Sequence, residues 1–243
     1  MRARFVTPEG IAVPAVTAEE MREIDRIALE ETGPNLYQMM ENAGRDLALL
    51  ALELLGSAWR DASVLVLAGS GGNGGGGICA ARHLANRRVR TLVCLAQPDR
   101  LGEVPAFQRK IFGSTSGREV TADKLESVRP DLILDALIGY GLRSAPAGNA
   151  AALIGWANRS EIPVLSLDVP SGLNATTGEA PAAVIRAKRT LTLALPKTGL
   201  AAAEAGELFL GDIGIPESAY RRLSLNYVSP FGSRFRVALL VTR

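Results

Sequence analysis

The sequence predicts a single α/β domain of three layers (αβα), with a doubly wound, mostly parallel, Rossmann-like sheet. Short apolar runs alternate with helical patterns along the chain, as they do in βαβ units. A glycine-rich segment, Gly69–Gly77, directly follows the first of these runs, and ligands of such sheets bind at this position. Two later runs end in Asp135 and Asp168. The length of 243 residues suits one large domain.

Residues 1–15 are expected to be a leader of uncertain order, and residues 16–228 the domain itself. The first clear element follows Thr17, because Thr17-Ala-Glu-Glu20 has the capping-box pattern in which two side chains satisfy early helical amides. Apolar residues at helical spacing then predict a helix that Gly33-Pro34 ends, followed by a second helix that closes at Gly56.

Beyond Gly56 the pattern alternates between strands and helices. The apolar runs are continuous rather than alternating, which is typical of parallel strands buried on both faces. For residues 229–243 the sequence leaves open an added strand or a tail. The expected strands are 63–68, 89–95, 132–135, 164–168, 190–194 and 207–210, and the expected helices are 78–86, 101–112, 122–128 and 149–158.

Composition excludes several classes of protein. Twenty-seven basic residues against 25 acidic ones give a net charge of +2, which does not indicate a nucleic-acid partner. Cys79, Cys94 and a single histidine indicate neither a disulfide framework nor a zinc site. No apolar run has the roughly 18 residues that a membrane span needs, and the start lacks a secretory signal. A cytoplasmic location is therefore expected.

The glycine-rich segment is the first candidate ligand site. Glycines let the backbone approach a ligand closely, and the amides that open the next helix can hold an anion. A flexible low-complexity turn is the alternative, but the position between a strand and a helix favours binding. Gly69, Gly71 and Gly74 match the G-x-G-x-x-G pattern. The acid expected about 20 residues later for a dinucleotide ribose is missing, which argues against an ordinary NAD-dependent dehydrogenase.

Polar residues after three strands form the second candidate. Right-handed crossovers bring the carboxyl ends of parallel strands to one edge, so Asp135, Asp168 and the glycine segment should converge. Each Asp could instead cap a turn. Lys197, just past another strand, could neutralise a phosphate or transfer a proton, or it could be an exposed loop lysine. Ser171 suits a turn or an oxygen ligand, and His83, in mid-helix, suits packing or the surface.

Taken together, the segments resemble the YjeF N-terminal domain family, the NAD(P)H-hydrate (NAD(P)HX) epimerases. The resemblance runs in order over about residues 16–216. Its matching segments are 16–25, 40–44, 69–77, 81–84, 135–142, 167–172, 190–197 and 212–216.

The resemblance implies a role in nicotinamide cofactor repair. NAD(P)H can be hydrated at C6 of its ring, and members of this family interconvert the R and S hydrates. A separate dehydratase that uses ADP or ATP restores the S form. The resemblance thus implies NADHX or NADPHX as substrate, functional coupling to that dehydratase, no nucleic-acid or membrane partner, and, by analogy, a homodimer.

The resemblance also implies site residues. A potassium ion would be held by Asn73, Asp135 and Ser171, whose oxygen ligands suit a hard cation. Asp168 and Lys197 would be catalytic. The substrate would contact Gly72, Asn73, Gly74, Gly75, Gly76, Gly139, Tyr140, Gly141, Leu142, Arg143, Ser144, Ala145 and Asp168.

The chemistry expected of these residues is acid–base. Epimerisation at C6 requires loss of the hydroxyl, with a push from the ring nitrogen, and addition of water to the other face. A carboxyl group can protonate the departing oxygen and later deprotonate water. The hypothesis is that Asp168 does so, with Lys197 or the cation tuning its charge.

Two departures from the family pattern keep a second function open. The family loop reads Gly-x-Gly-Asn-Asn-Gly-Gly-Asp-Gly, whereas this chain has Gly72 at the first Asn and Gly76 at the Asp. Each lost polar contact can cost about 1–3 kcal/mol. The alternative is therefore a catalytically weakened or inactive member that binds nucleotide or serves as a scaffold. A nucleotide-dependent oxidoreductase is a third, disfavoured alternative.

Overall fold

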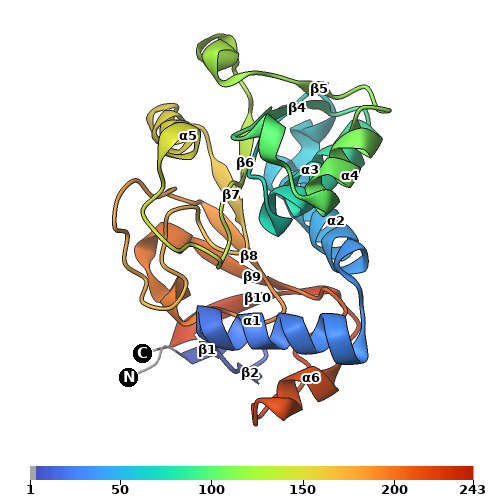
Figure 1. The fold of residues 1–243 in the computed structure, drawn as a ribbon, viewed down its shortest axis with the longest axis vertical. Helices are drawn as coiled ribbons and strands as arrows, with labels where there is room; N and C mark the ends of the chain where they lie inside the picture. Colours follow the sequence, from blue (N-terminus) through green and yellow to red (C-terminus); the bar gives the residue numbers. More distant parts are fainter. Residues whose placement is uncertain (1–3, 243) are drawn as a thin grey trace.

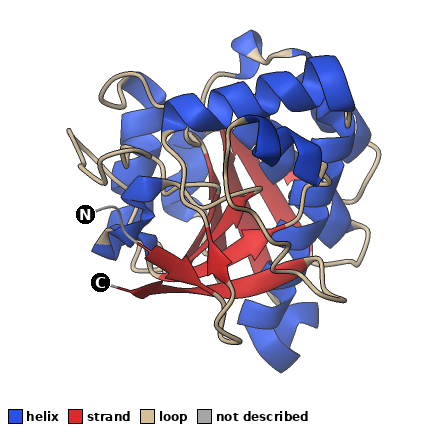
Figure 2. Ribbon diagram, turned by 90° about the horizontal axis from the view of Figure 1, so that it is seen from below, coloured by secondary structure: helices blue, strands red, loops and turns tan. Residues whose placement is uncertain are grey.

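The computed structural model describes residues 4–242 and consists of one central sheet with helices on both sides (Figures 1 and 2). The strand order is β2-β1-β10-β9-β8-β7-β6-β3-β4-β5. All neighbours from β9 through β8, β7, β6, β3 and β4 to β5 pair in parallel. The pairs β9–β10, β10–β1 and β1–β2 at the other end of the sheet are antiparallel. The strands are β1 (Arg4–Val6), β2 (Ala12–Val13), β3 (Ser63–Ala68), β4 (Arg90–Leu95), β5 (Arg118–Glu119), β6 (Leu132–Ala136), β7 (Val164–Leu167), β8 (Arg189–Leu193), β9 (Glu207–Gly211) and β10 (Arg236–Thr242).

The helices form the outer two layers. Helices α2, α3 and α4 cover one face of the sheet and α5 covers the other (Figure 1). This arrangement confirms the predicted doubly wound, mostly parallel fold. The helices are α1 (Ala18–Ile27), α2 (Leu36–Leu55), α3 (Gly72–Ala85), α4 (Glu103–Phe112), α5 (Gly148–Arg159) and α6 (Glu217–Arg222), with a π-helical turn at Ala28–Thr32 and short 3-10 turns at Gly56–Arg60, Pro98–Arg100, Ala122–Ser127, Thr198–Ala201 and Ala203–Ala205.

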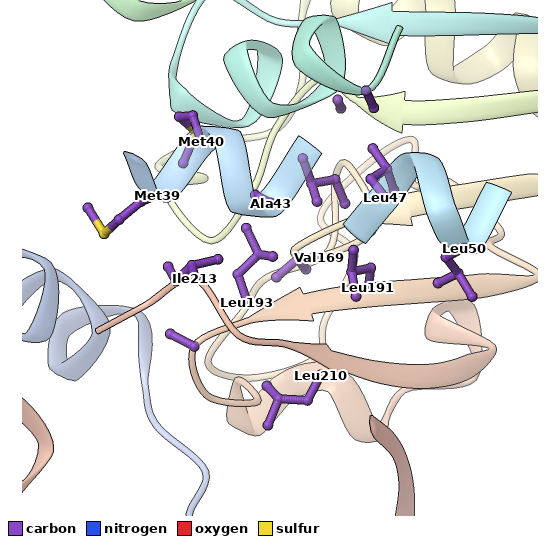
Figure 3. Packing of buried hydrophobic residues seen from close by; sticks show 14 of the residues in the cluster. Met39, Met40, Ala43, Leu47, Leu50, Val169, Leu191, Leu193, Leu210 and Ile213 are labelled. Atoms are coloured by element: carbon purple, nitrogen blue, oxygen red, sulfur yellow. The ribbon is translucent and has the colours of Figure 1, made fainter. Parts of the chain in front are cut away.

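Strand β3 shows why its apolar run is continuous. Val64, Val66 and Ala68 belong to the buried cluster under α2 and α3, whereas Leu65 and Leu67 belong to the cluster under α5. Because successive side chains of a strand point to opposite faces, a strand covered on both sides needs apolar residues at every position. Figure 3 shows the first of these clusters, in which α2 packs over β8, β9 and the turn after β7.

The glycine-rich segment is mostly helical, which corrects the predicted helix start at residue 78. Helix α3 begins at Gly72, although glycine disfavours helix interiors by about 1 kcal/mol. Close packing explains the glycines, since a Cβ on Gly74 would collide with the Gly69 carbonyl oxygen and one on Gly77 with the Ala136 side chain. Only residues 69–71 form the turn between β3 and the helix.

The N-terminal residues take part in the fold. Thr17 and Glu20 form the predicted capping box, and Gly33 follows the π-helical turn that extends α1. Within the segment expected as a leader, β1 and β2 join the sheet, and β1 pairs with β10; residues 1–3 lie outside the described residues. Residues 236–242 thus form an added strand, and no helix among the described residues is long and apolar enough to cross a membrane.

Candidate active site

A cavity of about 490 Å³ opens at the carboxyl ends of β6, β7 and β8. Its size is within the range of small-molecule sites. Helices α1 and α2 and the first turn of α3 supply its other walls. The lining residues are Met21, Arg22, Asp25, Leu36, Met39, Met40, Ser70, Gly71, Gly72, Asn73, Leu137, Ile138, Gly139, Tyr140, Gly141, Arg143, Leu167, Asp168, Leu193, Lys197 and Ile213.

Asp168 lies at the end of β7 and has an unusual backbone conformation. Its φ is +67°, and the Val169 amide donates to the Leu167 carbonyl across it at 2.9 Å. A non-glycine residue in such a tight turn is strained and persists only when its surroundings enforce it. Here the Asp168 amide donates to Leu191 of β8 at 2.7 Å, so the sheet holds the turn. The result is a carboxylate aimed into the cavity on a rigid support.

Lys197 forms a buried ion pair with Asp168. Its Nζ donates to Asp168 Oδ1 and to the Leu193 carbonyl, the latter at 2.9 Å. The side chains of Lys197 and Asp168 are only 1% and 6% exposed. The chain segment around Lys197 is held by a bridge to Val16, with main-chain hydrogen bonds in both directions. The exposed-loop alternative for Lys197 is therefore wrong.

The loop after β6 encloses Asp168 from the other side. The Tyr140 amide donates to Asp168 Oδ2 at 2.7 Å. A Cβ on Gly139 would lie 2.7 Å from the same oxygen and 3.2 Å from Asn73 Oδ1. The loop therefore fits between Asp168 and the start of α3 only because residue 139 is glycine.

Residues of the glycine-rich segment divide between the wall of the cavity and the layer beneath it. Gly72 and Asn73 line the cavity, whereas Gly74, Gly75 and Gly76 are buried in α3 below it. A Cβ on Gly72 would meet little, its nearest neighbour being Met40 Sδ at 3.9 Å, whereas one on Gly76 would lie 2.7 Å from Leu167. In the 139–145 loop, Gly139, Tyr140, Gly141 and Arg143 line the cavity. Leu142, Ser144 and Ala145 are outside its wall.

Asp135 and Ser171 are fully buried behind this loop. Ser171 donates to Asp135 from its hydroxyl at 2.5 Å and from its amide at 2.9 Å, and Ser166 donates at 2.8 Å. Burial raises the pKa of Asp135, and these hydrogen bonds oppose the rise. Ser171 also accepts from the Ile138 amide at 2.8 Å, which ties the pair to the loop that contacts Asp168.

Sequence reasoning missed two polar residues of the cavity, Arg22 and Asp25. Asp25 lies on α1 and accepts a hydrogen bond from the Tyr140 hydroxyl. It is four positions after Met21, which also lines the cavity, and residues with this spacing lie on the same side of a helix. Apart from the family match of segment 16–25, this spacing was the available sequence signal, because nothing local indicates that α1 reaches the ends of β7 and β8.

His83 is not in the cavity, in agreement with its predicted packing role. Its ring contacts Glu41 of α2 at 2.8 Å, and Cys79 lies 3.4 Å from the same carboxylate. These three side chains have the composition of a metal site. However, the Arg82 guanidinium already pairs with Glu41, so the cluster functions as a contact between α2 and α3.

Known proteins resemble this chain in both sequence and fold. One relative is 51% identical over 240 residues, or 98% of each chain, and is named "NAD(P)H-hydrate epimerase" from Dehalogenimonas lykanthroporepellens. Another is named "Bifunctional NAD(P)H-hydrate repair enzyme Nnr" from Escherichia coli. It is 37% identical over 207 residues, which are 82% of this chain and 39% of that one.

A solved structure shares the fold. The crystal structure of yeast ynu0, YNL200c, superposes with a TM-score of 0.81, covering 93% of this chain and all of that one at 21% identity. The sequence family described as "YjeF-related protein N-terminus" matches residues 36–199. With that match over more than half of its length, and with Asp168 and Lys197 at one cavity, the chain belongs to the YjeF-related N-terminal family.

Proposed function

We propose that this chain is an NAD(P)H-hydrate epimerase, an isomerase that interconverts the R and S forms of NADHX and NADPHX. The observation that carries the proposal is the buried Asp168–Lys197 pair at the cavity. It occurs in a chain that matches a named epimerase over almost its whole length. Relatives named epimerases also occur in Rhodopirellula baltica, Weissella koreensis and Truepera radiovictrix.

Asp168 and Lys197 are proposed as the catalytic residues. The ion pair and the Tyr140 amide hold both carboxylate oxygens of Asp168 in place. A carboxylate fixed in this way can accept the proton that water loses as it adds to C6 of the substrate. Its negative charge would also stabilise the ring cation that forms when the hydroxyl leaves. Lys197 keeps the carboxylate from being an isolated buried charge.

The cavity can bind a dinucleotide through its rim and the start of α3. The main-chain amides at the start of this helix can hold an anionic phosphate. Arg22 and Arg143 lie at the same cavity and are exposed, so they can add positive charge for phosphates. We propose that the segments 72–76 and 139–145 follow the substrate, with Gly72, Asn73, Tyr140 and Arg143 in contact with it.

A potassium ion is proposed as cofactor, held by Asn73, Asp135 and Ser171. The donor set fits, because it offers amide, carboxylate and hydroxyl oxygens and no thiolate. Asp135 is fully buried, and within residues 4–242 no lysine or arginine forms an ion pair with it. A cation would offset the cost of that buried charge. Activity and thermal stability should therefore be higher in potassium chloride than in choline chloride of equal ionic strength.

Partners and location are part of the same proposal. Some relatives are named bifunctional NAD(P)H-hydrate repair enzymes, which supports functional coupling to an ADP/ATP-dependent dehydratase. A homodimer is proposed by family analogy. The two free, buried cysteines are compatible with a reducing cytoplasm.

The decisive experiment supplies purified protein with R-NADHX, an S-specific dehydratase and ADP or ATP, and records the recovery of NADH absorbance. The recovery should be faster than with dehydratase alone, and Asp168→Asn should abolish the gain while nucleotide binding is kept. Nucleotide binding without any acceleration would instead establish the scaffold function that Gly72 and Gly76 leave open.

A further inference from the structure

Asp25 and Tyr140 form a second polar pair beside the Asp168–Lys197 pair. The Tyr140 hydroxyl donates to Asp25 Oδ2, while the Tyr140 amide donates to Asp168. Lys197 Nζ lies 5.6 Å from the centre of the Tyr140 ring. Asp25, Tyr140, Asp168 and Lys197 all line the cavity. One tyrosine thus connects two carboxyl groups that come from α1 and from the end of β7.

The two carboxyl groups have different surroundings. Asp168 is paired with a buried ammonium group, whereas Asp25 contacts a neutral hydroxyl. Burial raises the pKa of Asp25, and the Asp168 charge raises it further, against the Tyr140 hydrogen bond and the Lys197 charge, which lower it. Two carboxyls in such contrasting environments are how one site provides both an acid and a base near neutral pH.

The reaction requires both functions. When the C6 hydroxyl leaves, its oxygen needs a proton, and when water adds to the other face, it must lose one. With two groups, one can donate the proton to the departing oxygen and the other can accept the proton from water, so that no single carboxylate has to act at both faces of the ring. The ion pair suits Asp168 for the second step. Because the Lys197 ammonium group is engaged with Asp168 and the Leu193 carbonyl, the first step calls for a different donor.

We propose that Asp25, acting through the Tyr140 hydroxyl, supplies the proton that the departing C6 oxygen takes up. The inference rests on the proposed epimerase function and deepens it. Tyr140 is the group in contact with the substrate, and Asp25 is the positioning residue that holds the hydroxyl and replaces its proton.

The C6–O bond breaks and its electron pair stays on oxygen, while the lone pair of the ring nitrogen forms the C6–N double bond. The oxygen takes the Tyr140 proton and leaves as water, and Tyr140 takes the Asp25 proton. Water then adds to the other face and gives a proton to Asp168. The site is restored when that proton returns from Asp168 to Asp25 through water, and the reverse reaction follows the same path backwards.

The groups around Asp25 determine how this proposal depends on pH. Besides Tyr140, they are Lys197 and Asp168 across the cavity, Arg22 on the same helix and Tyr220 of α6. Burial also raises the pKa of Tyr140, so its hydroxyl stays protonated at neutral pH. If Asp25 is the group that titrates, kcat should fall as the pH rises through the Asp25 pKa, because deprotonated Asp25 can no longer replace the Tyr140 proton.

The test uses Asp25→Asn in the coupled R-NADHX assay across pH. The amide oxygen of Asn can still accept the Tyr140 hydrogen bond but the side chain cannot give a proton. We expect kcat to fall on the order of 100-fold, the usual scale of a lost general acid, with KM and melting temperature nearly unchanged and the alkaline decline gone. Tyr140→Phe should show the same loss. Glu23→Gln, which alters an exposed ion pair on the same helix, is the matched control.

Each outcome of these assays supports or overturns the role proposed for Asp25 and Tyr140. An Asp25→Asn enzyme with wild-type kcat and pH profile overturns the proposal, as does full turnover by Tyr140→Phe, and in both cases the epimerase function itself stands. An inactive wild-type protein overturns the epimerase function and this inference with it. If Asp25→Asn does not fold, Tyr140→Phe decides, because it removes only the hydroxyl.

Discussion

Replacing Lys197 with methionine isolates the energetics of the buried ion pair. Both side chains are almost completely buried, so Lys197→Met leaves the Asp168 carboxylate without its partner in a low-dielectric site. Breaking such a pair from one side typically costs about 3–5 kcal/mol. For a domain of this size, at about 2–4 °C per kcal/mol, the melting temperature should fall by roughly 6–20 °C.

The double variant Lys197→Met/Asp168→Asn separates the loss of the ion pair from the cost of leaving the Asp168 carboxylate unpaired. The amide can still accept from the Tyr140 amide, and no unpaired charge remains, so the double variant should be more stable than Lys197→Met alone. Urea unfolding of the two single variants and the double variant gives the interaction energy directly. If the two single costs simply add, the pair carries no coupling energy and the argument for a fixed, ion-paired base is refuted.

Three further predictions concern the cavity and the core. Gly139→Ala would bring a methyl group to 2.7 Å from Asp168 Oδ2, so kcat should fall on the order of tenfold or more through misplacement of that carboxylate, whereas unchanged kinetics would contradict the close fit. Gly72→Asn should keep wild-type stability because a Cβ at this position has free space. Gly76→Asp should lower the free energy of unfolding by about 1–3 kcal/mol through overpacking against β7. The denaturant midpoints of the two variants check this, and equal midpoints would contradict it. Burial raises the pKa of Asp46 from 3.8 to about 6, so its contribution to stability, full below pH 4, is lost as the pH rises through 6. Asp46→Asn should therefore match wild type near pH 4 and be more stable near pH 8 by about 1–2 kcal/mol, because solvent screens part of the effect on this carboxyl. A difference independent of pH would exclude Asp46 as the cause.

The order and type of the main elements could be predicted because each has a local cause. The capping box of α1, the apolar run of β3 and the glycine that closes α2 act over a few residues. The start of α3 could not be predicted in this way. Local propensity disfavours a helix through Gly72–Gly77, and the close packing of these glycines against strands of the sheet and against α2 and α4 favours it.

The candidate site was predictable where it depends on strand ends. Asp168 follows β7 directly and Lys197 lies four positions after the end of β8, and parallel topology brings such positions together. Asp25 could not be found in this way, because its place at the cavity depends on how α1 docks. That docking involves the bridge between Val16 and Lys197, two residues 181 positions apart in the chain, for which the sequence gives no local signal.

The pairing of β1 with β10 has a consequence for how the chain folds. Arg4 is opposite Thr242 in the sheet. Since a chain is synthesised at roughly 5–20 residues per second, β10 leaves the ribosome roughly 12–48 s after β1. The parallel strands β3 to β9 are all available before β10 has been made. Contacts between such distant residues also form slowly. The antiparallel edge is therefore the last part of the sheet to close. Until it does, β1 can pair with β2, but its side facing β10 is an unpaired strand edge that a holding chaperone can shield from aggregation.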